Sequence, residues 1–144
     1  MKTPLLLASL TLALLPAASA RADTVPSLIG TWALADEAFA AARVGTSNKY
    51  FDDLPKPTFG TPDQAFTYTI EAQDGRAFHG VATGPQGKSE AIVGVIRFDN
   101  KEILMSGDSG TVEGRLVDDK LELCWIDSLP TWNAVSCGLF KKTK

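Results

Sequence analysis

Short turn-forming sequences recur along the second half of this chain of 144 residues. Between them lie short segments rich in β-branched and aromatic residues, which are typical of strands. Such close spacing leaves little room for the crossovers that parallel strands need, so it predicts an all-β antiparallel meander. The turns fall at Asp74-Gly75, Gly84 to Gly87, Asp99-Asn100, Gly107-Asp108, Asp118-Asp119 and Ser128 to Asn133.

Eight strands are expected, and most of them alternate between apolar and polar residues. In the second, Phe66, Tyr68 and Ile70 alternate with threonines, which predicts one buried face and one face in water. Closing eight antiparallel strands removes both sheet edges, so an up-and-down barrel is the preferred fold. An eight-stranded sandwich would show similar periodicity and stays open as an alternative. The expected strands cover residues 28–35, 65–72, 76–83, 89–98, 101–106, 110–117, 120–127 and 134–141.

A long insertion separates the first two expected strands, from Asp36 to Asp63. Residues 37–43 have the composition of a short helix, whereas prolines interrupt residues 49–57. We therefore expect a partly helical insertion. The segment Ala91 to Ile96 is apolar on both faces, and the insertion is expected to cover its outer face. A loop of this length in a compact domain tends to be functional or mobile.

The first 20 residues have the features of a signal peptide: Lys2, an apolar run from Leu5 to Leu15, and a small-residue cleavage site at Ala18 to Ala20. The run is too short to span a bilayer, which needs ~20 apolar residues. Residues 21–144 are therefore expected to form one periplasmic or secreted domain without membrane insertion. Without Lys2, 13 basic residues stand against 17 acidic ones, which argues against nucleic-acid binding.

Export makes the two cysteines informative, because disulfides persist in oxidising compartments. With two cysteines, Cys124 and Cys137, only one pairing exists. A hairpin that turns near Leu129 to Trp132 places them opposite each other on one face, close enough to bridge. We expect a structural disulfide, since a redox-active pair is usually Cys-x-x-Cys beside a helix.

The first expected strand carries Gly30-Thr31-Trp32. A Gly-x-Trp at this place resembles the calycin group of small barrels, which includes lipocalins, fatty-acid-binding proteins and avidin-like proteins. The resemblance implies that Trp32 plugs one end of the barrel, and the indole N–H of such a buried ring needs a carbonyl partner. The stretches 66–70, 74–80, 93–96 and 121–124 look like bacterial exported domains of avidin-like appearance, so the resemblance covers most of residues 28–141. The biotin-contacting residues of avidins have no residue-by-residue counterpart here, so biotin binding is not carried over.

Catalytic and metal-binding patterns are weak in this sequence. The one histidine, His79, is expected on the outer face of a strand, and one histidine cannot form a metal cluster. A Ser-His-Asp set meets only in space, but no Gly-x-Ser-x-Gly nucleophile elbow appears. The pairs Asp52-Asp53 and Asp118-Asp119 are interpreted as loop and turn residues. We therefore expect no enzyme activity, no metal and no cofactor.

Binding remains as the expected function, with aromatic residues beside polar ones as the candidate contacts. These side chains either bind a partner or fold down over the core. The first hypothesis is a non-enzymatic binding protein that holds a small apolar or amphipathic ligand in the barrel or at its rim. The alternative is an inhibitor or interaction partner of a secreted or periplasmic enzyme, acting through the 36–63 loop or the N-terminal arm. The candidate binding residues are Tyr50, Phe51, Asp127, Trp132 and Asn133.

Overall fold

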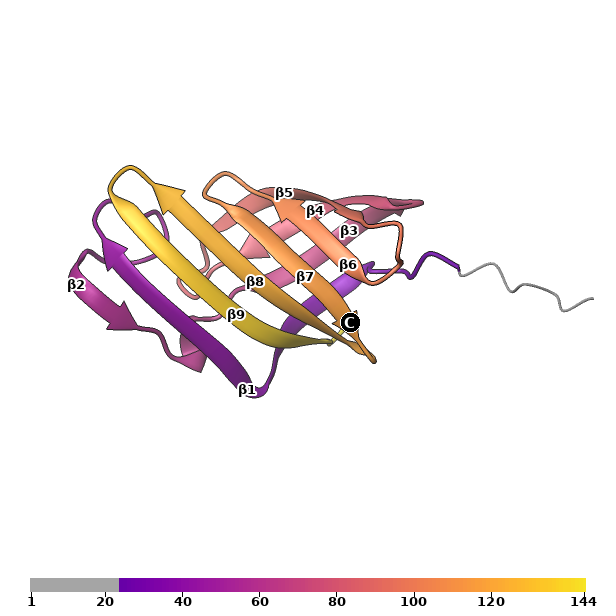
Figure 1. Ribbon diagram of the computed structural model, residues 1–144, viewed down its shortest axis with the longest axis horizontal. Coiled ribbons are helices and arrows are strands. Elements are labelled where there is room, and N and C mark those ends of the chain that lie inside the picture. Colours follow the sequence, from indigo (N-terminus) through magenta and orange to yellow (C-terminus); the bar gives the residue numbers. More distant parts are fainter. Residues whose placement is uncertain (1–23) are drawn as a thin grey trace, which may run out of the picture.

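A computed structural model describes residues 24–144 (Figure 1). The predicted signal peptide, residues 1–20, lies outside the described residues. The chain forms a run of strands with one turn of 3-10 helix, η1, at Pro62–Gln64. The strands are β1 (Gly30–Gly45), β2 (Leu54–Phe59), β3 (Thr67–Asp74), β4 (Ala77–Thr83), β5 (Ser89–Ile96), β6 (Glu102–Ser106), β7 (Thr111–Val117), β8 (Lys120–Leu129) and β9 (Trp132–Lys142).

A closed antiparallel barrel is the central feature of the fold. The strands β3 to β9 pair in chain order, and β1 pairs with both β3 and β9, which closes the sheet. In Figure 1, β7, β8 and β9 cross the front of the barrel and β3, β4 and β5 lie behind. The extra strand β2 pairs with the last residues of β1, outside the ring of eight. The barrel expected from the sequence is thus confirmed, and the alternative, a sandwich, is not what the chain forms.

The core fills the barrel axis with the apolar residues of the alternating pattern. Tyr68 and Ile70 of β3 and Leu121, Leu123 and Trp125 of β8 are all buried, as their parity predicts. Burial of these apolar side chains is the main stabilising contribution to folding. The alternation read from the sequence therefore assigns the inner face correctly.

The predicted helix over residues 37–43 is wrong, because these residues continue β1. The strand bends at Asp36 and Glu37, which have φ of 50° and 56°, and its register against β9 shifts between Leu34 and Phe39. Residues beyond the bend pair with β9 up to Gly45. Alanine and glutamate favour helices only by fractions of a kcal/mol each, which the strand ladder and its buried side chains outweigh.

The predicted cover over the outer face of β5 is also wrong. Val93 and Val95 are 61% and 45% exposed, because the insertion runs to one end of the barrel instead. Their strand forms the middle of an open groove of about 720 Å³ on the outside of β3 to β6. Its apolar side chains include Ala72, Ala77 and Leu104.

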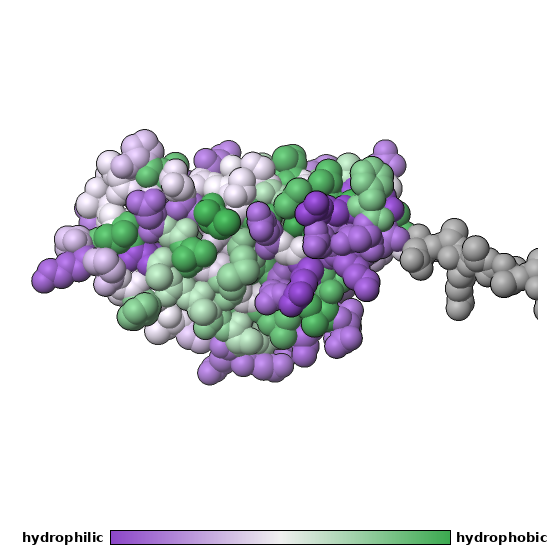
Figure 2. Space-filling model, viewed as in Figure 1, coloured by the Kyte–Doolittle hydropathy of each residue, from purple (hydrophilic) through white to green (hydrophobic). Residues whose placement is uncertain are grey.

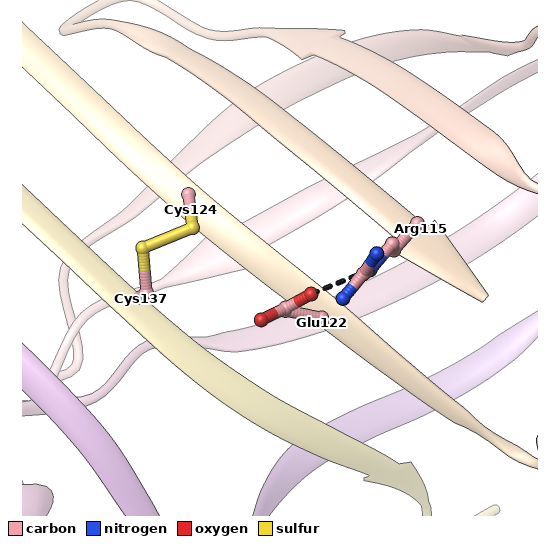
Figure 3. The surroundings of a disulfide bond; sticks show 4 residues. All are labelled: Arg115, Glu122, Cys124 and Cys137. Carbon is pink, nitrogen blue, oxygen red and sulfur yellow. Dashed lines mark hydrogen bonds and ion pairs between the residues drawn. A yellow bond between two sulfur atoms is a disulfide. The ribbon is translucent and has the colours of Figure 1, made fainter. Parts of the chain in front are cut away.

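The disulfide joins β8 and β9, next to the β1–β9 pairing that closes the barrel. Figure 3 shows Cys124 of β8 bonded to Cys137 of β9, and the two residues are direct partners in the strand register. Nearby, Arg115 Nε donates a hydrogen bond of 2.7 Å to Glu122. The same face carries hydrophilic side chains over β6 and β7, and more apolar ones over β8 and β9 (Figure 2). Within residues 24–144, no helix is long and apolar enough to cross a membrane.

Candidate functional site

The segment between β1 and β3, residues 46–66, closes one end of the barrel and is called the cap below. It includes β2 and η1 and lies at the left in Figure 1. Backbone hydrogen bonds hold it to the barrel at two positions: Thr46 N–H donates to Thr131 O at 2.9 Å, and Gly60 N–H donates to Ala41 O at 3.0 Å. The barrel end beneath it, called the cap end, therefore has a defined cover.

Aromatic rings from the cap pack against rings of the barrel wall. Tyr50 meets Phe66 edge-on with centroids 4.9 Å apart, and Phe66 stacks on Trp125 at 5.3 Å. Phe51 stacks on Trp132 at 6.0 Å. Such pairs add about 0.5–1.5 kcal/mol each to area burial. The cap end is thus a continuous aromatic cluster.

A buried arginine lies on the inner side of this cluster. The guanidinium of Arg43 is 4.1 Å from the centroid of the Phe51 ring and donates to Gln64 at 2.5 Å. Burial lowers the pKa of Arg43, and the nearby charge of Asp63 opposes that shift. Arg43 comes from the second half of β1, where its parity with Phe39 and Ala41 turns it inward.

A carboxylate, that of Glu90, is buried at the start of strand β5. The side chain of Glu90 is 0% exposed, and Ser109 Oγ donates to both of its oxygens at 3.2 Å. Lys49 Nζ lies 3.7 Å from Glu90 and 3.7 Å from Asp108. The same ammonium lies 4.9 Å from the centroid of the Tyr50 ring. The cap thus carries a cation to a buried anion of the wall.

Asp127 is a second buried carboxylate of the wall, with 5% of its surface exposed. Burial raises its pKa to about 6, while the hydrogen bond that Asn48 Nδ2 donates at 3.1 Å opposes the shift. Burial, and then the nearby side chain of Glu90, also raises the pKa of the Tyr50 hydroxyl. Titratable groups with perturbed pKa values that gather at one cavity are a marker of functional sites.

Three buried polar atoms at the cap end make no hydrogen bond to any residue in the described part of the chain. They are Tyr50 Oη, Asp127 Oδ1 and Trp132 Nε1. Each such atom costs about 1–3 kcal/mol, so native proteins rarely keep them without a reason. Tyr50 and Asp127 line a cavity of about 20 Å³, which has room for about one water molecule.

The structure brings most of the predicted binding residues together. Tyr50, Asp127 and Trp132 are buried at the cap end, and Phe51 is half-buried against Trp132. Asn133 is exposed on the outer face, where its side chain accepts a hydrogen bond from Ser128 at 3.4 Å. Folding down over the core, the second of the two arrangements considered from the sequence, is thus the one that the aromatic residues adopt.

Sequence reasoning missed Arg43, Lys49, Glu90 and Ser109. Glu90 shares its parity with Ile92 and Ile96, so the alternation of β5 already turned it inward. Because residues 37–43 are expected to form a helix, strand parity was not applied to Arg43. Lys49 and Ser109 lie in irregular segments, whose side-chain directions periodicity does not give.

The remaining polar candidates are exposed to solvent. His79 is on β4, with its side chain 61% exposed and Nδ1 3.9 Å from Glu71. Asp118 occupies the turn between β7 and β8 with φ of 56°, and Asp53 accepts a hydrogen bond from Ser47 N–H. In the part of the chain that is described, no group of three metal-ligating side chains comes together.

Comparison with known proteins found no family, no curated protein and no solved structure that matches this chain. The barrel is compatible with a calycin-like fold through its eight antiparallel strands. Function is therefore inferred from the geometry of the cap end.

Proposed function

We propose that this chain is an exported, non-enzymatic binding protein that holds a small amphipathic molecule at the cap end of the barrel. The observation that carries the proposal is the group of unpartnered polar atoms on Tyr50, Asp127 and Trp132. A ligand with a polar head can complete their hydrogen bonds, and the rings of Phe66 and Trp125 suit its apolar part.

Binding at this end requires the cap to move. The cavity of about 20 Å³ is far below the ~300–1,000 Å³ of ligand pockets, so a ligand takes space that Tyr50 fills in the closed chain. Residues 47–53 of the cap are held to the wall by side-chain contacts such as Asn48 to Asp127 and Lys49 to Glu90. Segments held in this way open at lower free energy than the barrel strands.

Export is part of the same proposal. The signal-like residues 1–20 and the single disulfide are typical of proteins made for the periplasm or the exterior. A binding protein in such a compartment meets small molecules from the surroundings of the cell.

Native mass spectrometry of the protein purified from its own host tests the proposal. We expect a small molecule that stays bound in the native spectrum and leaves on denaturation. Asp127→Asn should lose it, because the buried carboxylate is part of the site. Asp119→Asn, in the exposed turn before β8, is the matched control and should keep it. A bare mass for the wild-type chain would contradict the proposal.

A second candidate function is binding of an exported protein through the cap. The observation that favours it is Phe59 on β2, whose surface is 87% exposed. Its neighbours Pro55 and Pro57 lack N–H donors, so a partner would contact side chains rather than extend the sheet. Pull-down from the exported fraction should recover a partner with the wild-type chain and lose it with Phe59→Ser. Equal recovery by both chains would remove this candidate.

A further inference from the structure

Lys49 and Tyr50 place an ammonium group beside an aromatic ring, and both groups are held by the cap end. The ammonium lies 3.7 Å from each of Glu90 and Asp108 and 4.9 Å from the centroid of the Tyr50 ring. A cation near carboxylates and over a ring gains both ion-pair and cation–π attraction. The cap thus inserts a cationic aromatic unit into the barrel end.

Glu90 is built into the wall as an anion that needs a cation. Its side chain is 0% exposed, and burial of a charge costs free energy unless a counter-charge and hydrogen bonds compensate it. Ser109 supplies hydrogen bonds, while the counter-charge is Lys49, whose side chain is 43% exposed. At 3.7 Å this pair is longer than the ~2.7–2.9 Å of a strong charge-assisted hydrogen bond. The compensation is therefore incomplete.

The closed cap also leaves other groups of the site unsatisfied. Asp127 Oδ1 and Trp132 Nε1 have no hydrogen-bond partner among residues 24–144, although both residues are more than nine-tenths buried. The positive group on the opposite side, Arg43, is already engaged by Gln64 and Phe51. Of the two unpartnered atoms, the carboxylate oxygen Asp127 Oδ1 can accept a hydrogen bond from a positive head group, whereas the indole N–H of Trp132 needs an acceptor.

We propose that the cap end binds an organic cation that carries an aromatic ring, an arylalkylammonium, and that Lys49 and Tyr50 occupy its place in the closed chain. The proposal rests on the proposed binding function at the same site and names the class of its ligand. The ligand ammonium replaces that of Lys49 between Glu90 and Asp108. Its ring replaces that of Tyr50 against Phe66.

Isothermal titration of the full chain with three probes tests the head-group charge. The probes are 2-phenylethylammonium, neutral 2-phenylethanol and anionic 3-phenylpropanoate, which share one ring. The ammonium should bind about two- to fivefold more tightly than the alcohol, since the ion-pair position that it takes from Lys49 is partly exposed. The anion should bind most weakly. Added salt should weaken the ammonium alone.

Variants separate a ligand site from a structural ion pair. Lys49→Met removes the competing ammonium and should tighten 2-phenylethylammonium binding about two- to fivefold, the factor that a partly exposed ion pair supplies. Lys56→Met on exposed β2 is its control and should change nothing. Glu90→Gln should abolish the preference for the ammonium over the alcohol. Glu113→Gln on the outer face of β7 should keep it.

The outcomes distinguish this inference from the proposed function. Equal binding of the ammonium and the alcohol overturns the cation assignment and leaves a binding function in place. Unchanged or weaker ammonium binding by the folded Lys49→Met variant, which keeps Glu90, overturns the assignment as well. Absence of binding by all three probes also overturns it, while the proposed function is decided separately by native mass spectrometry.

Discussion

The two ends of the barrel bury the same kind of side chain in opposite ways. At one end Trp32 is 4% exposed and its indole N–H donates to Leu28 O at 2.8 Å. Gln73 in turn accepts from Leu28 N–H at 2.8 Å and donates to Pro26 O at 2.9 Å. At the cap end Trp132 is 0% exposed, and its indole N–H has no partner in the described chain.

The two ends differ in how completely their buried polar groups are hydrogen-bonded. At the Trp32 end, the buried polar groups of this network satisfy one another, as a stable core requires. At the cap end the chain keeps Tyr50 Oη, Asp127 Oδ1 and Trp132 Nε1 unpartnered and Glu90 only partly compensated. Unsatisfied groups of this kind destabilise a closed state and favour a ligand that supplies the missing partners.

The largest expected effect belongs to the Trp32 end. Trp32→Ala should lower the free energy of unfolding by about 3–5 kcal/mol, because a buried ring is lost and a cavity remains. Urea denaturation followed by circular dichroism measures it. Phe59→Ala, at an 87% exposed position on the cap, should change stability by less than about 0.5 kcal/mol. A similar small change for Trp32→Ala would break the comparison.

The disulfide lies between the two ends and should support both alike. Cys124→Ser should cost about 2–4 kcal/mol, the usual scale for one native disulfide. Thermal unfolding with and without reductant checks the value, and the variant should match the reduced wild-type chain. Unchanged melting under reductant would show that this bridge does not stabilise the barrel.

Asp127 gives the cap end its own pH dependence. Its pKa is about 6 in the folded chain against an ordinary 3.8, chiefly because of burial, so between these values the folded chain holds a proton that the unfolded chain has lost. Stability should therefore fall as pH rises from 4 to 6. Asp127→Asn should remove this loss and gain on the order of 2 kcal/mol relative to wild type at pH 7. Denaturation midpoints at pH 4 and pH 7 measure the difference, and an equal gain at both would contradict it.

The smallest effect compares the two tryptophans directly. Trp32→Phe and Trp132→Phe remove the same atoms, but only Trp32 loses a hydrogen bond and leaves Leu28 O without its donor. The first should cost about 1–2 kcal/mol more than the second. Paired urea titrations resolve this difference, and equal costs would mean that the indole of Trp132 is bonded in solution.

Sequence patterns predicted the wall of the barrel better than its cap. Turn residues and alternation predicted eight strands and the buried face of residues such as Tyr68 and Leu123, because strand parity fixes side-chain direction. The hairpin turn also predicted the pairing of Cys124 with Cys137, which the structure contains.

The failures share one cause, which is long-range pairing. Residues 37–43 favour a helix locally, yet β9 pairs with them as a strand. Once Arg43 lies on a strand it faces the core, and the same parity puts Glu90 inside. The contact between Lys49 and Glu90 joins segments 41 residues apart, and no local pattern encodes it.

Hydrogen exchange of the three indole N–H groups, followed by NMR in the nitrogen-15-labelled chain, tests the contrast between the two ends most directly. The indole of Trp132 should exchange about 100-fold faster than that of Trp32 or more, because opening the cap costs less than unfolding the barrel. A bound ligand should slow Trp132 and leave Trp32 unchanged. Equal protection of the two indoles, with or without ligand, would contradict a cap end that opens to bind.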